Sequence, residues 1–160
     1  MHALRCLFLL VGLSIFPGCA KKENSATAPA QPATTPHAHK APHDGTAVVL
    51  GHEAYHLELV RDAASGRLTA YVLDGEMEAF VRVKAATLEF AVTANGGRRA
   101  LTLRAVANPA TGESVGDTSQ FEAQEDWLKT TPVFDAVLAS IEIKGSKFEQ
   151  VAFNFPKGND

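Results

Sequence analysis

Short runs in which apolar and polar residues alternate fill the chain from Gly45 onward, and they constrain the fold more than any other feature. Tyr55, Leu57 and Leu59 alternate with polar neighbours, which is the period of two expected of a strand with one buried face. The pattern recurs in later runs, whose apolar members are Leu88, Phe90, Val92, then Leu101, Leu103, Ala105, then Val137, Ala139, Ile141, Ile143, and finally Val151, Phe153 and Phe155. No long helical pattern interrupts these runs, so we expect an all-β fold.

Turn residues separate the runs at four places, namely 62–66 (DAASG), Asn95-Gly96, 108–112 (NPATG) and Gly145-Ser146. Asn-Gly is the strongest short hairpin signal, because both positions tolerate the positive φ of a tight turn. Four such turns between alternating strands predict a single antiparallel β-sandwich or a small open barrel. The spacing of residues 133–138, after Pro132, also fits a short helical turn.

The N-terminal segment has the form of a secretory leader. Arg5 precedes a largely apolar run from Cys6 to Phe16. This run is long enough for the apolar region of a leader, about 7–15 residues, and shorter than the roughly 20 residues of a membrane-spanning helix. We therefore expect residues 1–18 to be removed.

The end of this leader, Phe16-Pro17-Gly18-Cys19, resembles the lipobox of bacterial lipoproteins. Gly18 and Cys19 match that motif, whereas Phe16 and Pro17 depart from its usual residues. The resemblance implies that Cys19 carries the lipid, including palmitate, and becomes the N-terminus. Because Ala20 is not the Asp that retains such proteins at the inner membrane, the periplasmic face of the outer membrane is favoured. The alternative is an ordinary leader that is cut after Ala20.

Composition divides the rest of the chain. Residues 19–42 are rich in Ala, Pro and Thr and lack large apolar side chains, so we expect a disordered tether. Residues 43–156 are expected to form the β-domain, and 157–160 a disordered tail. Without Arg5, 14 basic residues face 18 acidic ones, a net charge of −4, and no basic stripe suggests nucleic-acid binding. With Cys6 removed and Cys19 acylated, no disulfide is expected.

No catalytic motif stands out in the sequence. It has no G-x-S-x-G elbow, glycine-rich phosphate loop or H-E-x-x-H. Glu122, Glu125 and Asp126 form the densest acidic patch, beside Trp127, and are interpreted as solvated surface. We do not expect an enzyme.

Every histidine after the leader lies within residues 37–56, and these are His37, His39, His43, His52 and His56. Neutral imidazole suits Cu, Zn and Ni. If 46–50 pairs with 55–61, Val49 faces His56 and His43 falls beside Asp62, about 20 Å from His56 along the strand. This predicts two separate groups, a tail group (His37, His39, His43) and a domain group (His52, His56). The alternative is that all five are linker and surface residues.

Residues 43–75, HDGTAVVLG…YHLELVRDAASGRLTAYVLDG, resemble a module of small bacterial periplasmic lipoproteins and of some heavy-metal efflux adaptor proteins. Asp44 departs from that pattern, and the chain lacks the helical hairpin of an adaptor. The resemblance implies a role in metal or envelope homeostasis. Two functions remain open: a lipid-anchored protein that binds Cu, Zn or Ni, or a structural module that holds an envelope protein or a metal-efflux partner.

Overall fold

The computed structural model describes residues 40–159. The expected leader, the lipid-attachment residue Cys19, most of the tether and the histidines His37 and His39 lie outside this part. Within it, the elements in chain order are β1 (Thr46–Leu50), β2 (Tyr55–Asp62), β3 (Arg67–Asp74), β4 (Thr87–Ala94), β5 (Gly97–Ala105), β6 (Gln120–Gln124), α1 (Trp127–Thr130), β7 (Phe134–Ile143) and β8 (Ser146–Phe155). The predicted all-β class is confirmed.

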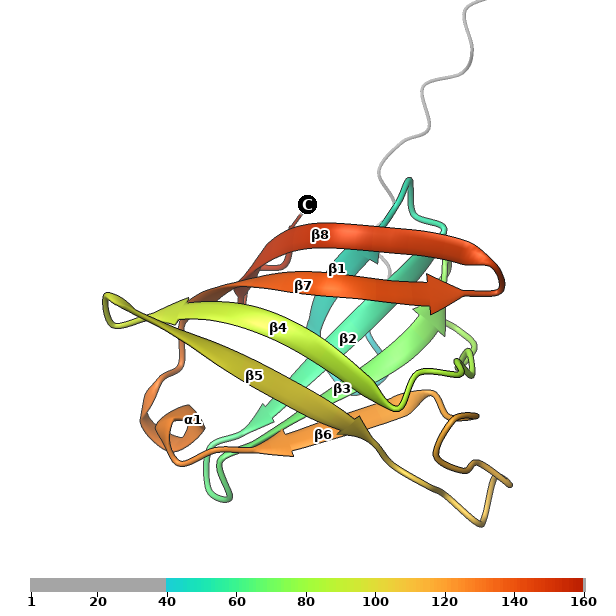
Figure 1. The fold of residues 1–160 in the computed structure, drawn as a ribbon, viewed down its shortest axis with the longest axis horizontal. Coiled ribbons are helices and arrows are strands. Elements are labelled where there is room, and N and C mark those ends of the chain that lie inside the picture. Colours follow the sequence, from blue (N-terminus) through green and yellow to red (C-terminus); the bar gives the residue numbers. More distant parts are fainter. Residues whose placement is uncertain (1–39, 160) are drawn as a thin grey trace, which may run out of the picture. The chain divides into compact units, whose positions relative to one another are not determined.

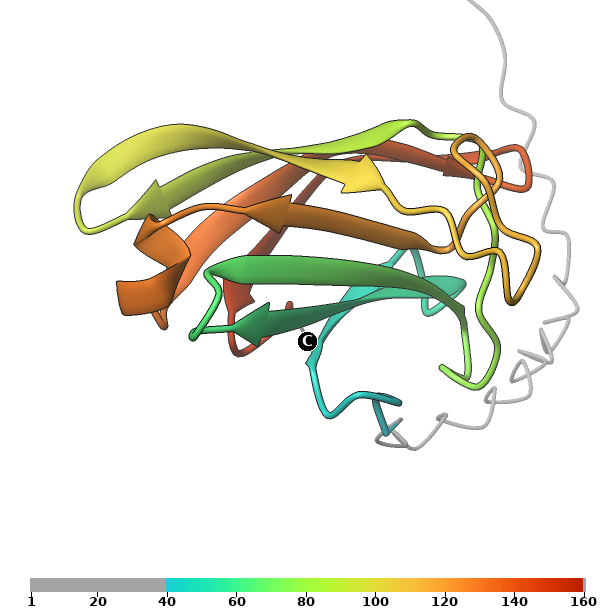
Figure 2. The ribbon, with the colours of Figure 1, turned by 90° about the horizontal axis from the view of Figure 1, so that it is seen from below.

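The strands form a single antiparallel sheet in the order β1-β2-β3-β6-β5-β4-β7-β8. The sheet coils so far that its first and last strands, β1 and β8, come to lie beside each other (Figures 1 and 2). The result is a nearly closed, barrel-like sheet. Of the two predicted architectures, the small open barrel describes the fold.

The local hairpins follow the predicted register. Leu50 pairs with Tyr55 and Val49 with His56, as expected for β1 and β2. Strands β4 and β5 are joined through Asn95 and Gly96, whose φ angles are 51° and 75°. Two successive positive φ angles are those of a type I′ turn, which matches the twist of the flanking strands.

One face of every strand points into the barrel and builds the main core. In β4 the burial alternates strictly, with Leu88, Phe90 and Val92 buried and their neighbours exposed or half-buried. In β2 the inward residues are Leu57 and Leu59, both fully buried. A second, small cluster of Ala41, Leu73 and Met77 lies on the outer side of the sheet. Part of the outer face of β2 and β3 is therefore covered as well.

The inward face of β7 differs from the prediction. We expected Val137, Ala139, Ile141 and Ile143 to share one face, but Ala139 is exposed and Val137 only half-buried. The inward residues of β7 are Phe134, Ala136, Leu138, Ile141 and Ile143. The buried residues of β7 are even-numbered up to Leu138 and odd-numbered from Ile141 onward. This change lies opposite Gln150 of β8, whose φ is 52°. A local departure from extended geometry re-aims the side chains that follow it.

A short helix forms at a place where no helical pattern is found in the sequence. Residues 133–138 belong to the loop before β7 and to β7 itself, so the helical alternative for this segment is wrong. The helix is α1, with Leu128 fully buried in the core. Its carbonyl at Leu128 accepts a hydrogen bond from Arg61 Nη1, which ties α1 to β2. No helix in the described part is long and apolar enough to cross a membrane.

Residues 156–159, which follow β8, are ordered, whereas a disordered tail was expected at 157–160; residue 160 lies outside the described part. Asn154 and Gly158 exchange backbone hydrogen bonds of 2.9 and 2.7 Å. The chain then runs along β1, where Thr46 Oγ1 donates to Pro156 O and Asn159 binds Val49. Residues 156–159 thus fill the seam between β1 and β8.

Candidate functional site

The segment before β1, residues 40–45, is here named the strap. If it continued the register of β1, His43 would lie beside Asp62. Instead, the N–H of Asp44 donates to Ala41 O at 3.1 Å, and Asp44 has a φ of 54°. This turn directs His43 over the outer face of β2, so the predicted position of His43 is wrong.

Glu58 of β2 holds the strap in place. Its carboxylate is fully buried and accepts the backbone N–H groups of His43 (2.7 Å) and Gly45 (2.9 Å). Its other oxygen lies 2.8 Å from His43 Nδ1. A Cβ at Gly45 would lie 2.7 Å from both Glu58 Cγ and Leu59 O, so a glycine permits this close approach. A buried carboxylate needs such donors, because desolvation without them is costly.

Two aromatic rings complete the surroundings of His43. Its imidazole stacks on the ring of Tyr71, with centroids 4.0 Å apart and planes 13° apart. Phe80 lies 5.9 Å from both rings. Tyr71 pairs with Glu58 across β2 and β3, so both side chains leave the same face of the sheet. Burial, and then the charges of Glu122 and Glu58, raise the pKa of Tyr71.

These residues form one wall of a groove of about 500 Å³, here named the His43 groove. The lining residues are His43, Tyr71, Phe80, Arg82, Asn108, Thr111, Glu113, Ser119 and Gln120. They come from the strap, from β3, from the connection between β3 and β4, from the loop between β5 and β6, and from the start of β6. The groove therefore exists only in the folded chain.

Arg82 and Glu113 organise the opposite wall. Glu113 accepts hydrogen bonds from Ser119 N, Ser119 Oγ and Thr111 Oγ1. Burial acts to raise the pKa of Glu113, but these bonds and the Arg82 guanidinium outweigh it and lower the pKa. Arg82 also binds Asp117, at 3.2 Å, and the carbonyl of Thr111. The loop from 108 to 119 is thus fastened by charge-assisted hydrogen bonds.

In the described part of the chain, neither His52 nor His56 joins His43 in a cluster. His52 is exposed in the turn between β1 and β2, while His56 is buried, with Nδ1 3.3 Å from Asp74 O. Within residues 40–159, no three or more His, Cys, Asp or Glu side chains converge as a metal site would require. Glu58 fixes His43 on the domain, whereas His37 and His39, which were predicted to group with it, lie outside the described residues.

Sequence reasoning did not select Glu58, Tyr71, Phe80, Arg82 or Glu113. The signal at Glu58 is a carboxylate in the middle of an apolar strand, where alternation with Leu57 and Leu59 predicts that it faces outward. The outward direction is correct, but Glu58 and His56 are both buried beneath other segments. Asp126 of the acidic patch lies on the solvated surface, as predicted, because its side chain is 95% exposed and pairs with Lys129.

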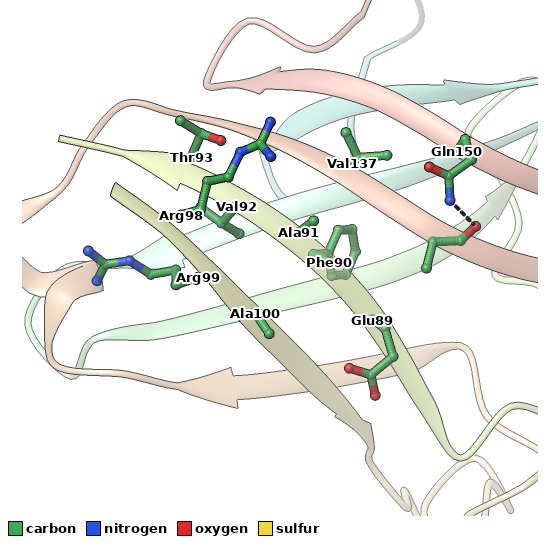
Figure 3. Close-up of a pocket in the computed structure, with 11 residues that line it drawn as sticks. Glu89, Phe90, Ala91, Val92, Thr93, Arg98, Arg99, Ala100, Val137 and Gln150 are labelled. Atoms are coloured by element: carbon green, nitrogen blue, oxygen red, sulfur yellow. Dashed lines mark hydrogen bonds between the residues drawn. The ribbon is translucent and has the colours of Figure 1, made fainter. Parts of the chain in front are cut away.

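A second hollow lies on the outer face of the sheet where β4, β5 and β7 run side by side (Figure 3). Its volume is about 570 Å³, and its floor is formed by small side chains such as Ala91, Ala100 and Val137. The polar side chains at its margin point in different directions, and Gln150 Nε2 donates to Ala139 O of the neighbouring strand. Because no titratable groups converge there, the His43 groove is the stronger candidate.

No family of known proteins, no curated protein and no solved structure matches this chain, so the His43 groove has to be interpreted from its own geometry.

Proposed function

We propose that this protein is lipid-anchored at the periplasmic face of the outer membrane and binds a divalent transition metal, Cu, Zn or Ni, through His43. The contact between His43 Nδ1 and the buried Glu58 carboxylate carries this proposal. A carboxylate acceptor holds the ring proton on Nδ1 and leaves the lone pair of Nε2 for a metal. Histidine ligands in metal sites have their second ring nitrogen fixed in this way.

The ring is also accessible, since the His43 side chain remains 37% exposed while Glu58 is 0% exposed. Stacking on Tyr71 fixes the plane of the imidazole. A ligand whose orientation is set before the metal arrives loses little rotamer entropy on binding. Among the histidines of the described part, His43 best combines an oriented ring with access to solvent.

One imidazole does not complete a coordination sphere, which for Zn has four donors. His37 and His39 precede His43 by six and four residues, and an extended chain reaches about 13–20 Å over that length. We propose these two as the further protein ligands. Ordering their segment costs entropy, so moderate rather than tight affinity is expected. His52 and His56 remain candidates for separate, weaker binding.

Calorimetric titration of the mature protein, purified without a polyhistidine tag, with Cu, Zn and Ni tests the site. His43→Ala should weaken binding at least tenfold, and Glu58→Gln by about 10–100-fold, because the outer partner tunes the ligand. His52→Ala, in the exposed turn, is the matched control and should leave the tighter binding assigned to His43 unchanged. Replacing His37 and His39 should weaken binding without abolishing it.

Binding should also weaken on acidification, because protonated imidazole does not coordinate a metal. A His43→Ala variant that titrates like the wild type would refute the site.

The anchor requires its own experiment. Cys19→Ser should move the protein from the membrane to the soluble fraction, because the acyl chains are then absent. A variant that stays with the membrane would contradict the lipoprotein proposal.

The alternative function is an interaction or structural module for an envelope protein or a metal-efflux partner. Two apolar side chains outside the groove are well exposed, Val115 by 63% and Val133 by 54%, and favour this alternative. Wild-type protein that binds none of the three metals, but is crosslinked in cells to one partner through these positions, would establish it.

A further inference from the structure

We propose that the His43 groove also binds a small organic cation, with a quaternary or protonated ammonium group set against the rings of Phe80 and Tyr71. This site does not require the metal proposed above. It rests on the charge of the groove, the state of Arg82 and the exposure of one aromatic face.

Charge favours a cation over an anion. Three carboxylates, Glu58, Glu113 and Asp117, lie at or next to the groove, and Arg82 is the guanidinium among its lining residues. The lowered pKa of Glu113 keeps its carboxylate ionised at neutral pH. Even with His43 protonated, these groups sum to a negative charge. A concave surface of one sign concentrates ligands of the opposite sign.

Arg82 is not available as an anion receptor. Its Nη1 donates to Gly112 O and to Asp117 Oδ2, and its Nη2 donates to Thr111 O. Its Nε lies 3.9 Å from Glu113 Oε1. The guanidinium is thus committed to the loop between β5 and β6. An anionic ligand would have to break these contacts before it met a positive charge.

The wall formed by His43, Tyr71 and Phe80 offers aromatic surface. Phe80 is 50% exposed, although its ring lies within 5.9 Å of both His43 and Tyr71. Phe80 therefore presents an accessible aromatic face to the groove that it lines. An ammonium group within about 6 Å of a ring centroid is attracted by the negative face of the ring. The volume of about 500 Å³ is that of a site for a small molecule.

Choline and its neutral isostere 3,3-dimethylbutan-1-ol are suitable probes, because they share a shape and differ in charge. The mature protein is titrated with each in the presence of EDTA, and backbone amide shifts are followed by NMR. We expect saturable shifts at Phe80, Arg82 and Glu113 with choline, and binding at least tenfold weaker for the alcohol. The anion 3,3-dimethylbutanoate should bind more weakly than choline.

Phe80→Leu retains apolar bulk and removes the ring, so it should weaken choline binding about three- to tenfold. Val133→Ala changes an exposed apolar residue that does not line the groove, and should have no effect. Equal binding of choline and the alcohol, tighter binding of the anion, an unaffected Phe80→Leu variant, or no saturable shift up to about 100 mM choline would each overturn the proposal. Since EDTA excludes metal, none of these outcomes bears on metal binding by His43.

Discussion

Asn159 binds both backbone polar groups of Val49. Its Oδ1 accepts the Val49 N–H at 2.7 Å, and its Nδ2 donates to Val49 O at 3.1 Å. The side-chain amide thereby takes the place that a neighbouring strand would occupy on the free edge of β1. The two residues are 110 positions apart, so this contact joins the two ends of the sheet.

Asn159→Ala should lower the free energy of unfolding by about 1–2 kcal/mol. Two hydrogen bonds are lost, each with a net contribution of about 0.5–1.5 kcal/mol, and water compensates in part at this exposed site. Urea denaturation measures the change. Lys157→Ala alters an exposed neighbour of the same segment and should stay within about 0.5 kcal/mol of the wild type. Equal stability of the two variants would show that Asn159 does not close the seam.

Gly158→Ala should be more damaging than Gly145→Ala, although both glycines have nearly the same φ, 83° and 84°. A Cβ at Gly158 would lie 2.3 Å from Ala47 O, whereas nothing lies within 4 Å of a Cβ at Gly145. Gly145→Ala therefore costs only the left-handed conformation, about 1 kcal/mol. Gly158→Ala adds a backbone clash and should lose at least about 2 kcal/mol more. Indistinguishable urea midpoints would contradict this packing.

The parts of the fold that the sequence predicts are local. The β1–β2 register and the Asn95-Gly96 hairpin follow from alternation and turn chemistry within about ten residues. The change of buried face in β7 lies opposite the positive φ angle of Gln150 in β8. The seam between β1 and β8 depends on the contacts of Asn159 with Val49. Neither leaves a periodic signal, because the contacts that produce them span distant parts of the chain.

The candidate site shows the same limit. The sequence indicated that His43 has the chemistry of a ligand but placed it beside Asp62, because a strand register was continued into residues that turn at Asp44. Its true partner, Glu58, lies 15 residues away and belongs to the neighbouring strand. Phe80 and Arg82 come from the connection between β3 and β4, and Glu113 comes from the loop between β5 and β6, so the groove forms only when the sheet coils.

Glu58→Gln should release the strap. The amide keeps one acceptor oxygen but cannot receive every N–H that the carboxylate accepts, which leaves a buried polar group poorly matched. Hydrogen exchange at the amides of His43 and Gly45 should accelerate at least tenfold, and stability should fall by about 1–3 kcal/mol. Glu53→Gln, in the exposed turn between β1 and β2, is the matched control. Unchanged protection at both amides would contradict the role of Glu58.

Glu113 should contribute a pH-dependent part of the stability. Burial raises its pKa, but hydrogen bonds from Ser119 and Thr111 and the charge of Arg82 lower it below its ordinary value of 4.5. A carboxyl group whose pKa is lower in the folded state stabilises that state above about pH 4.5, and this stabilisation is lost as the pH falls through the folded pKa. Urea denaturation between pH 7 and about pH 3 measures the loss. Glu113→Gln should be less stable than the wild type at neutral pH and lose less on acidification, with Ser119→Ala intermediate. Parallel curves for Glu113→Gln and the wild type would show that Glu113 does not fasten the loop.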